Sequence, residues 1–340
     1  MRSGSKISGL NKLPFEKRNK AVVVKIDNVK TSDRFGCKPN ERSVEELLEY
    51  GIVNLDKPSG PTSHQVSSYV KEILGIKKAG HSGTLDPKVT GVLPIALGRA
   101  TRIVQTLLPA GKEYVCLMHL HKPVEASIVK KVMLNEFVGR IKQLPPIKSA
   151  IKRQQRYRTI YYIDIIEISE DNKDVLFRIG CQAGTYIRKL VHDVGERLDV
   201  GANMQELRRT KAGPFKEEES FTLQDLKDAF YYYKEEGNDK MLYNIILPVE
   251  FAVSHLPKVW IQDSAVDTLC HGANLKVPGV VSMNKEFDIG DTVAIMTLKG
   301  ELVALGKAEM VAKQILKEKK GLAFKVDKVF MKPGVYPKIE

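Results

Sequence analysis

The sequence predicts an α+β protein: a mixed, mainly antiparallel sheet with flanking helices, followed by a small domain built mostly of β-strands. Between residues 50 and 250, strand and helix patterns alternate without the regular βαβ rhythm of a doubly wound parallel sheet. Past about Ser254 the pattern changes to short strands separated by glycine and lysine turns, which is typical of a small barrel. A chain of 340 residues also accommodates two folded domains more readily than one.

The first folded domain opens with a strand and a helix whose ends carry clear signals. Residues 51–55 are apolar enough for a strand, and two prolines follow it in a turn. Thr62 or Ser63 then caps a helix with apolar residues on one face, and Gly75 ends it. Further along we expect strands at 92–97, 113–119, 156–168 and 175–181, and helices at 100–108, 126–137, 186–198 and 222–247.

Two boundaries divide the chain into three parts. Residues 1–45 are polar, basic and weakly periodic, so we expect an N-terminal arm that becomes ordered by packing on the C-terminal domain. Pro248 marks the end of the first folded domain, which we assign to residues 46–250. The β domain occupies 251–335. Its expected elements are strands at 293–298, 302–310 and 323–329 and one short helix that Asp263 caps and Gly272 ends.

The charge balance points to a polyanionic partner. There are 54 Lys and Arg residues against 41 Asp and Glu, which leaves a net charge of +13 and an isoelectric point near 9.3. A basic surface that serves only solubility is the alternative. No apolar run approaches the ~20 residues of a membrane-spanning helix, and the N-terminal residues lack the apolar stretch of a signal peptide. We therefore expect no membrane partner.

The cysteines and histidines give no metal pattern. The four cysteines are scattered, which indicates a reducing compartment and thiols that serve as small apolar side chains. No C-x-x-C or clustered Cys/His sequence suggests zinc. His119 and His121 alternate on an expected strand and share a face, but a third ligand is not visible. We expect no bound metal.

The loop G-H-S-G-T-L-D-P-K-V-T-G at residues 80–91 displays one carboxylate, Asp86. Its glycines, among them Gly83 and Gly91, permit backbone conformations closed to other residues and let a ligand approach closely. Pro87 fixes its own φ and moves Asp86 out of the helical region. The sequence therefore predicts a rigidly held, exposed carboxylate, and an ordinary surface turn is the alternative.

Two other residues complete a set that could carry chemistry. Tyr114 lies at the start of an expected strand, near a loop edge where an aromatic face can stack on a ligand. Arg188 lies in the first turn of an expected helix, where cations are disfavoured, so a nearby carboxylate would account for it. An arginine partner would hold Asp86 ionised at neutral pH. The alternatives are a tyrosine packed at a sheet edge and a solvated arginine.

Several enzyme classes lack the residues they need. No second carboxylate has an acid role, which argues against ordinary glycoside hydrolysis. The chain has no phosphate-binding P-loop, no dinucleotide fingerprint and no Ser-His-Asp spacing. The remaining chemistry is that of a carboxylate, an arginine and an aromatic ring.

In four ordered segments the sequence resembles the TruB/dyskerin family of RNA pseudouridine synthases. They are K-P-S-G-P-T-S at 57–63, G-H-S-G-T-L-D-P-K-V-T-G at 80–91, G-T-Y-I-R-K-L-V-H-D-V-G at 184–195 and L-R-R-T-K-A-G-P-F at 207–215. K-E-Y at 112–114 and P-P-I-K-S-A at 145–150 fall between them. Residues past about 254 resemble the PUA RNA-binding domain of the archaeal and eukaryotic members, and H-L-P-K-V-W-I-Q-D-S-A-V at 255–266 is similar to that branch.

The resemblance implies roles for individual residues. Asp86 matches the catalytic aspartate, Tyr114 the active-site tyrosine and Arg188 the arginine that pairs with the aspartate. Positions that contact the flipped base or pack beside it match His81, Gly83, Thr84 and Leu207. No cofactor is implied, because the isomerisation of uridine oxidises nothing and releases no group.

The resemblance also implies partners. Bacterial relatives carry a longer insertion that clasps the tRNA arm, whereas residues 119–127 form only a short connection here. This is similar to the archaeal form, in which a box H/ACA guide RNA and small accessory ribonucleoprotein proteins position the substrate RNA. Specific uridines of rRNA, and of tRNA as a further substrate, are the implied targets. The implied location is the cytoplasm of an archaeon, or the nucleolus of a eukaryote.

Basic residues near the motifs are candidates for contacts with RNA phosphates. The candidates are Lys57, Lys148, Lys152, Arg153, Arg208 and Arg209. For each cluster, a solvated charged face is the alternative. Three other functions remain open: a stand-alone tRNA pseudouridine synthase, a non-catalytic RNA-binding scaffold, and a base-exchanging transglycosylase, which lacks its expected zinc ligands here.

Overall fold

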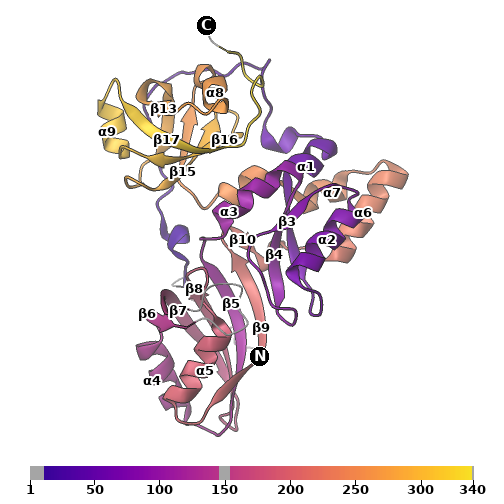
Figure 1. Ribbon diagram of the computed structural model, residues 1–340, viewed down its shortest axis with the longest axis vertical. Coiled ribbons are helices and arrows are strands. Elements are labelled where there is room, and N and C mark those ends of the chain that lie inside the picture. The colour runs from indigo at the N-terminus through magenta and orange to yellow at the C-terminus, as the bar shows by residue number, and fades with distance from the viewer. Residues whose placement is uncertain (1–10, 145–153, 339–340) are drawn as a thin grey trace, which may run out of the picture.

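The computed structural model describes residues 11–144 and 154–338. They form two sheets with helices packed around them. Figure 1 shows the smaller, C-terminal sheet at the top and the larger one running from the centre to the bottom. The mixed α+β class with mainly antiparallel pairing is confirmed, since among the named strands of the described residues β4–β9 and β12–β15 are the parallel pairs. Within the described residues, no helix is both long and apolar enough to cross a membrane.

The larger sheet has its main path in the order β11-β2-β4-β9-β5-β8-β7-β6, with β3 beside β4 and β10 beside β9. Its strands are β2 (Gly51–Lys57), β3 (Ala79–His81), β4 (Thr90–Leu97), β5 (Lys112–Leu120), β6 (Gly139–Gln143), β7 (Arg156–Ile168), β8 (Asp174–Cys181), β9 (Ala202–Ala212), β10 (Phe215–Lys216) and β11 (Ile246–Pro248).

The two halves of this sheet meet at one short junction. β4 pairs with β9 over only two residue pairs, Thr90 with Arg208 and Gly91 with Arg209. Gly91 has φ +101°, and a Cβ there would lie 2.2 Å from the carbonyl oxygen of Arg209. Only glycine allows this close approach. The junction therefore depends on Gly91, and the Asp86 loop ends beside it.

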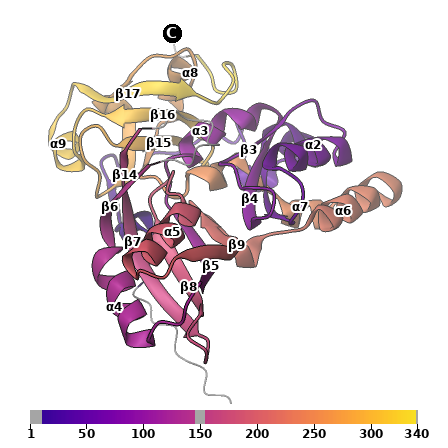
Figure 2. The ribbon, with the colours of Figure 1, turned by 60° about the horizontal axis from the view of Figure 1, so that its bottom comes forward.

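Helices cover each half of the sheet. They are α1 (Val44–Tyr50), α2 (Ser63–Ile73), α3 (Val104–Leu107), α4 (Ala126–Glu136), α5 (Ile187–Arg197), α6 (Leu223–Glu236) and α7 (Lys240–Ile245). Apolar residues of α1, α2, α6 and α7 pack with β2 and β4, and those of α4 and α5 pack with β5, β7 and β8. Figure 2 shows α6 and α2 on one side of the molecule and α4 and α5 on the other. Each half thus has its own core, and the junction lies between the two cores.

The C-terminal sheet has the strand order β1-β14-β12-β15-β16-β17-β13. Its elements are β12 (Lys258–Ile261), α8 (Asp263–Cys270), β13 (Leu275–Lys276), β14 (Val280–Asn284), β15 (Thr292–Thr297), β16 (Leu302–Ala308), α9 (Ala312–Lys317) and β17 (Leu322–Val329). Apolar residues from α8, α9 and the strands fill its core. Ala294, Met296, Leu302 and Leu305 also pack with residues of the larger domain.

The N-terminal segment contacts the C-terminal sheet. Its strand β1 (Val22–Val24) pairs antiparallel with β14. Lys25 Nζ donates to the carbonyl of Ile315 at 2.7 Å and to that of Glu318 at 2.9 Å. Backbone pairing and these bonds to carbonyls give the polar segment an ordered path along this sheet.

Several expected elements differ from those observed. The helix expected at 100–108 is a 3-10 helix (Gly98–Ile103) followed by α3. The one expected at 222–247 is two helices, because Gly237 ends α6 in the left-handed conformation at φ +65°. The prediction that Asp263 caps α8 is wrong, because Gln262 is the N-cap residue. The Asp263 carboxylate instead accepts hydrogen bonds from the hydroxyl of Thr31 and the amide of Ser32.

Candidate active site

The Asp86 loop connects β3 to β4 and is held by buried hydrogen bonds. Ser63 Oγ, at the start of α2, accepts from the Leu85 amide at 2.8 Å and donates to its carbonyl at 3.1 Å. The Val89 amide donates to the Asp86 carbonyl at 3.0 Å. These bonds fix the backbone on both sides of Asp86, while its side chain stays 55% exposed. The loop therefore displays a fixed, solvent-accessible carboxylate.

Lys57 also fixes this loop, from beneath. Its ammonium donates to the carbonyls of Pro58, Pro87 and Val89 at 2.8–3.0 Å. The residue is fully buried, and burial lowers the pKa of Lys57. The expected contact between Lys57 and RNA phosphates is therefore wrong, because its ammonium is enclosed and already saturated by three acceptors.

Arg188 and Asp86 form an ion pair. Arg188 is the second residue of α5, so its cation lies at the unfavourable end of the helix. The Asp86 carboxylate beside it accounts for that placement. Both side chains are more than half exposed. A substrate can therefore reach the pair, and a bound RNA would exclude water from it.

Tyr114 and Arg209 are partners on adjacent strands, β5 and β9. Arg209 is only 1% exposed. Its Nε donates to the Val92 carbonyl at 2.7 Å, and its Nη2 donates to the Gly83 carbonyl at 3.2 Å. Burial raises the pKa of Tyr114, and the positive charge of Arg209 opposes that rise. The expected RNA contact of Arg209 is wrong, because the guanidinium lies inside the sheet junction.

The four residues expected beside the substrate lie around the same junction. Thr84 is exposed on the Asp86 loop, while His81 on β3 and Gly83, with φ +80°, are partly buried. Within the described residues, Nδ1 of His81 is buried without a hydrogen-bond partner. Burial, with Arg209 and His64 nearby, lowers the pKa of His81. Leu207 on β9 packs with the core beneath α5.

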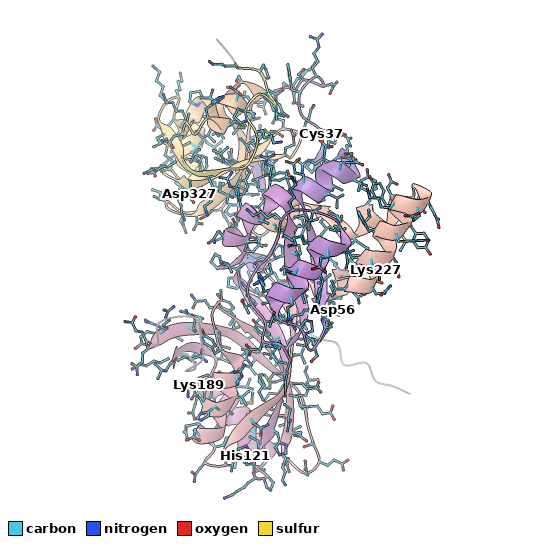
Figure 3. All side chains as sticks on the ribbon, turned by 45° about the vertical axis from the view of Figure 1, so that its right-hand side comes forward. Cys37, Asp56, His121, Lys189, Lys227 and Asp327 are labelled. Atoms are coloured by element: carbon cyan, nitrogen blue, oxygen red, sulfur yellow. The ribbon has the colours of Figure 1, made fainter. Side chains whose placement is uncertain are left out.

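The remaining basic candidates have different fates. Arg208 is 35% exposed and bonds the Asp56 carboxylate through two nitrogens, at 3.0 and 2.8 Å, and also pairs with Glu217. Figure 3 labels Asp56 near the middle of the molecule. Because two carboxylates already neutralise Arg208, a phosphate would have to compete with them. Lys148, Lys152 and Arg153 lie outside the described residues.

Two further supports of the site were not expected from the sequence. Lys112 Nζ donates to the carbonyls of Leu107, Leu108 and Ala110 at 2.7–3.0 Å, two residues before Tyr114. Buried Gln143 bonds both the amide and the carbonyl of Tyr186, each at 3.1 Å, at the start of α5. The position of Lys112 directly after Gly111 was a sequence signal for the first support. No sequence spacing links Gln143 to Tyr186.

The described residues hold no group of three or more metal-ligating side chains. His119 bonds Asp174 at 2.7 Å, and His121 bonds Asn203 at 3.1 Å. Figure 3 shows His121 at the lower end of the molecule. The two histidines thus have separate protein partners.

Comparison with family models identifies each part of the chain. Residues 71–187 match the TruB family pseudouridylate synthase (N terminal domain), and 188–254 match the tRNA pseudouridylate synthase B C-terminal domain. Residues 257–330 match the PUA domain, and 11–67 match the DKCLD (NUC011) domain. These models describe an enzyme of the pseudouridylate synthase class whose chain ends in a PUA domain.

Relatives agree over nearly the whole length. The chain is 56% identical over 327 residues to the "Probable tRNA pseudouridine synthase B" of Methanopyrus kandleri, covering 96% of this chain and 95% of that one. The protein of that name from Pyrococcus abyssi is 56% identical over 94% of this chain and 95% of its own. The chain therefore belongs to the TruB family of pseudouridine synthases, which are RNA isomerases.

Solved structures give the same result. A chain in the "Crystal Structure of a Cbf5-Nop10-Gar1 Complex" matches with a TM-score of 0.91 and 53% identity, over 96% of this chain and 99% of that one. A chain in the "Structure of H/ACA RNP bound to a substrate RNA containing 2'-deoxyuridine" matches with a TM-score of 0.89 and 51% identity, over 96% and 99%.

Proposed function

We propose that this chain isomerises specific uridines to pseudouridine as the catalytic subunit of a box H/ACA ribonucleoprotein, with Asp86 as the catalytic carboxylate. The observation that carries the proposal is the exposed ion pair between Arg188 on α5 and Asp86, which lies on a loop that buried lysine, serine and arginine side chains hold in place. The likeness to a chain of an H/ACA complex with bound substrate RNA supports the assignment of guide and substrate.

The reaction sets what the site must do. The N1–C1′ bond of uridine breaks, a C5–C1′ bond forms, and one proton leaves C5 while one is gained at N1. The target base has to leave its stack, which costs a few kcal/mol and is easiest in a single strand. Asp86 either attacks the ribose or the base, or removes a proton that commits the base to detachment. Tyr114 lies at the same junction, where its ring can stack on the base.

The C-terminal domain and the basic surface supply RNA binding in this proposal. Residues 257–330 match the PUA domain. Exposed lysines at 313, 317, 319 and 320 follow one another on and after α9. Small accessory proteins complete the particle, as the Nop10 and Gar1 chains do in the similar complex. We place the enzyme in the cytoplasm, a location supported by the similarity to archaeal relatives.

A second candidate is a stand-alone tRNA pseudouridine synthase, which the names of the relatives favour. Strand β5 ends at Leu120 and helix α4 begins at Ala126, so the connection between them is short. This short connection favours guided action instead.

The test is tritium release from 5-[3H]uridine RNA by the full chain, assembled with accessory proteins and a guide. We expect release with a guide complementary to the substrate and none above background with a scrambled guide. Release from bare tRNA as fast as from the guided substrate would support the second candidate. No release from either RNA would leave a non-catalytic RNA-binding scaffold and refute both enzymatic readings.

A further inference from the structure

Arg209 is a buried cation that no carboxylate neutralises. Its side chain is 1% exposed, and within residues 11–144 and 154–338 it forms no ion pair with Asp or Glu. Burying a charge without a counter-charge costs several kcal/mol in proteins. Consistent with this cost, burial lowers the pKa of Arg209. An apolar side chain would fill the same space at lower cost, so the guanidinium needs an explanation beyond packing.

The partners of Arg209 supply that explanation. One nitrogen bonds the Val92 carbonyl on β4, a second bonds the Gly83 carbonyl on the Asp86 loop, and Tyr114 on β5 is the cross-strand partner of Arg209. Nη1 lies 3.6 Å from the point where a Cβ on Gly83 would be. One rigid planar group therefore connects the strand junction to the loop that carries Asp86.

We propose that Arg209 is a positioning residue for the isomerisation: its guanidinium fixes the Asp86 loop against the strand junction, next to Tyr114 on the neighbouring strand. The proposal deepens the proposed function and rests on it. The planar fork of arginine donates in several directions at once, which a lysine ammonium on a flexible stem does not reproduce. Fixed placement of reacting groups before the substrate arrives is a large part of enzymatic rate enhancement.

The test compares Arg209→Lys with the wild-type chain in the reconstituted complex, by single-turnover tritium release at increasing enzyme concentration. A variant with a smaller folded fraction but an intact site keeps the wild-type rate constant at saturation, and a higher enzyme concentration is needed to reach saturation. A misaligned site instead lowers the rate constant at saturation. We expect a fall of about 10- to 100-fold in that constant, the range for loss of a hydrogen bond to a charged group. We expect RNA affinity to change less than about threefold, because Arg209 is buried away from RNA.

Arg42→Lys is the matched control. Arg42 is also a buried arginine and bonds Glu250 through two nitrogens at 2.8 Å, away from the Asp86 loop. Its replacement should lower the melting temperature and leave the saturating rate constant as in the wild type.

Three outcomes would overturn the proposal. An unchanged saturating rate constant for Arg209→Lys, with an active wild-type complex, shows that the guanidinium does not align the site. An equal loss of rate in the Arg42→Lys control assigns the effect to general stability. If neither Arg209→Lys nor Arg209→Gln folds by circular dichroism, the guanidinium serves the fold and not alignment. A wild-type complex that releases no tritium refutes the proposed function itself, which separates the two failures.

Discussion

Replacement of Arg188 by methionine separates the stability of the free protein from its catalysis. In the free chain the Arg188 and Asp86 side chains are 57% and 55% exposed. Exposed ion pairs contribute about 0–1 kcal/mol, because water screens them. Arg188→Met should therefore change the free energy of unfolding by less than about 1 kcal/mol, as measured by urea denaturation.

Catalysis should respond far more strongly. On the proposed function, RNA bound at Asp86 would cover the pair and remove water from it, which would lower the effective dielectric constant. Two unit charges about 4 Å apart interact by about 1 kcal/mol in water and about 4 kcal/mol at an effective dielectric constant of 20. A difference of about 3 kcal/mol corresponds to roughly a hundredfold in rate. We therefore expect Arg188→Met to lower the single-turnover rate of tritium release about a hundredfold.

The matched control is Arg197→Met at the other end of the same helix. Arg197 is also exposed and pairs with Glu136, but it lies nine residues from Arg188, about 13 Å along the helix axis. Its replacement should leave the rate within about twofold. The reasoning fails if Arg188→Met lowers the free energy of unfolding by several kcal/mol, or if both arginine variants lower the rate by the same factor.

Two further predictions concern buried titratable side chains. Lys57→Met leaves three buried carbonyls without their donor. We therefore expect the free energy of unfolding, measured by urea denaturation, to fall by about 2–4 kcal/mol, and the rate to fall as the Asp86 loop shifts. Unchanged stability would show that the loop keeps its conformation without Lys57. Burial lowers the pKa of His255 to about 4, below its unfolded value of about 6.5. Between these pH values the imidazole is protonated in the unfolded chain and neutral in the folded one. The free energy of unfolding therefore falls as the pH drops through this window. At pH 5 that loss is about 2 kcal/mol relative to pH 7, and His255→Leu should remove it; an equal acid loss in the variant would place the titration elsewhere.

The Asp86–Arg188 ion pair was predictable from the sequence because Arg188 breaks a local rule. Arg188 is unfavourable in the first turn of a helix, and a carboxylate nearby resolves the conflict. Asp86 stands between a glycine-rich turn and a proline, which predicts an exposed, fixed side chain. Strands and helices with clean apolar periodicity, such as 156–168 and 186–198, were likewise predictable to within a residue or two.

The failures have physical causes. β9 was not expected, because its run of Arg208, Arg209 and Lys211 looks like a solvated face, whereas the sheet buries Arg209 and pairs Arg208 with carboxylates. Lys57 looks like a surface cation for the same reason. Only the folded chain shows that backbone carbonyls from distant turns surround these groups. By contrast, α1 carried a local signal that was overlooked, the capping box of Ser43 and Glu46.

The most direct test of the enzyme assignment is tritium release by Asp86→Asn in the reconstituted guide complex. The substitution removes the charge and keeps the size of the side chain, and the loop is held by backbone bonds that it does not touch. The account predicts background release with RNA affinity and melting temperature close to those of the wild type. Release by Asp86→Asn at a substantial fraction of the wild-type rate would contradict it.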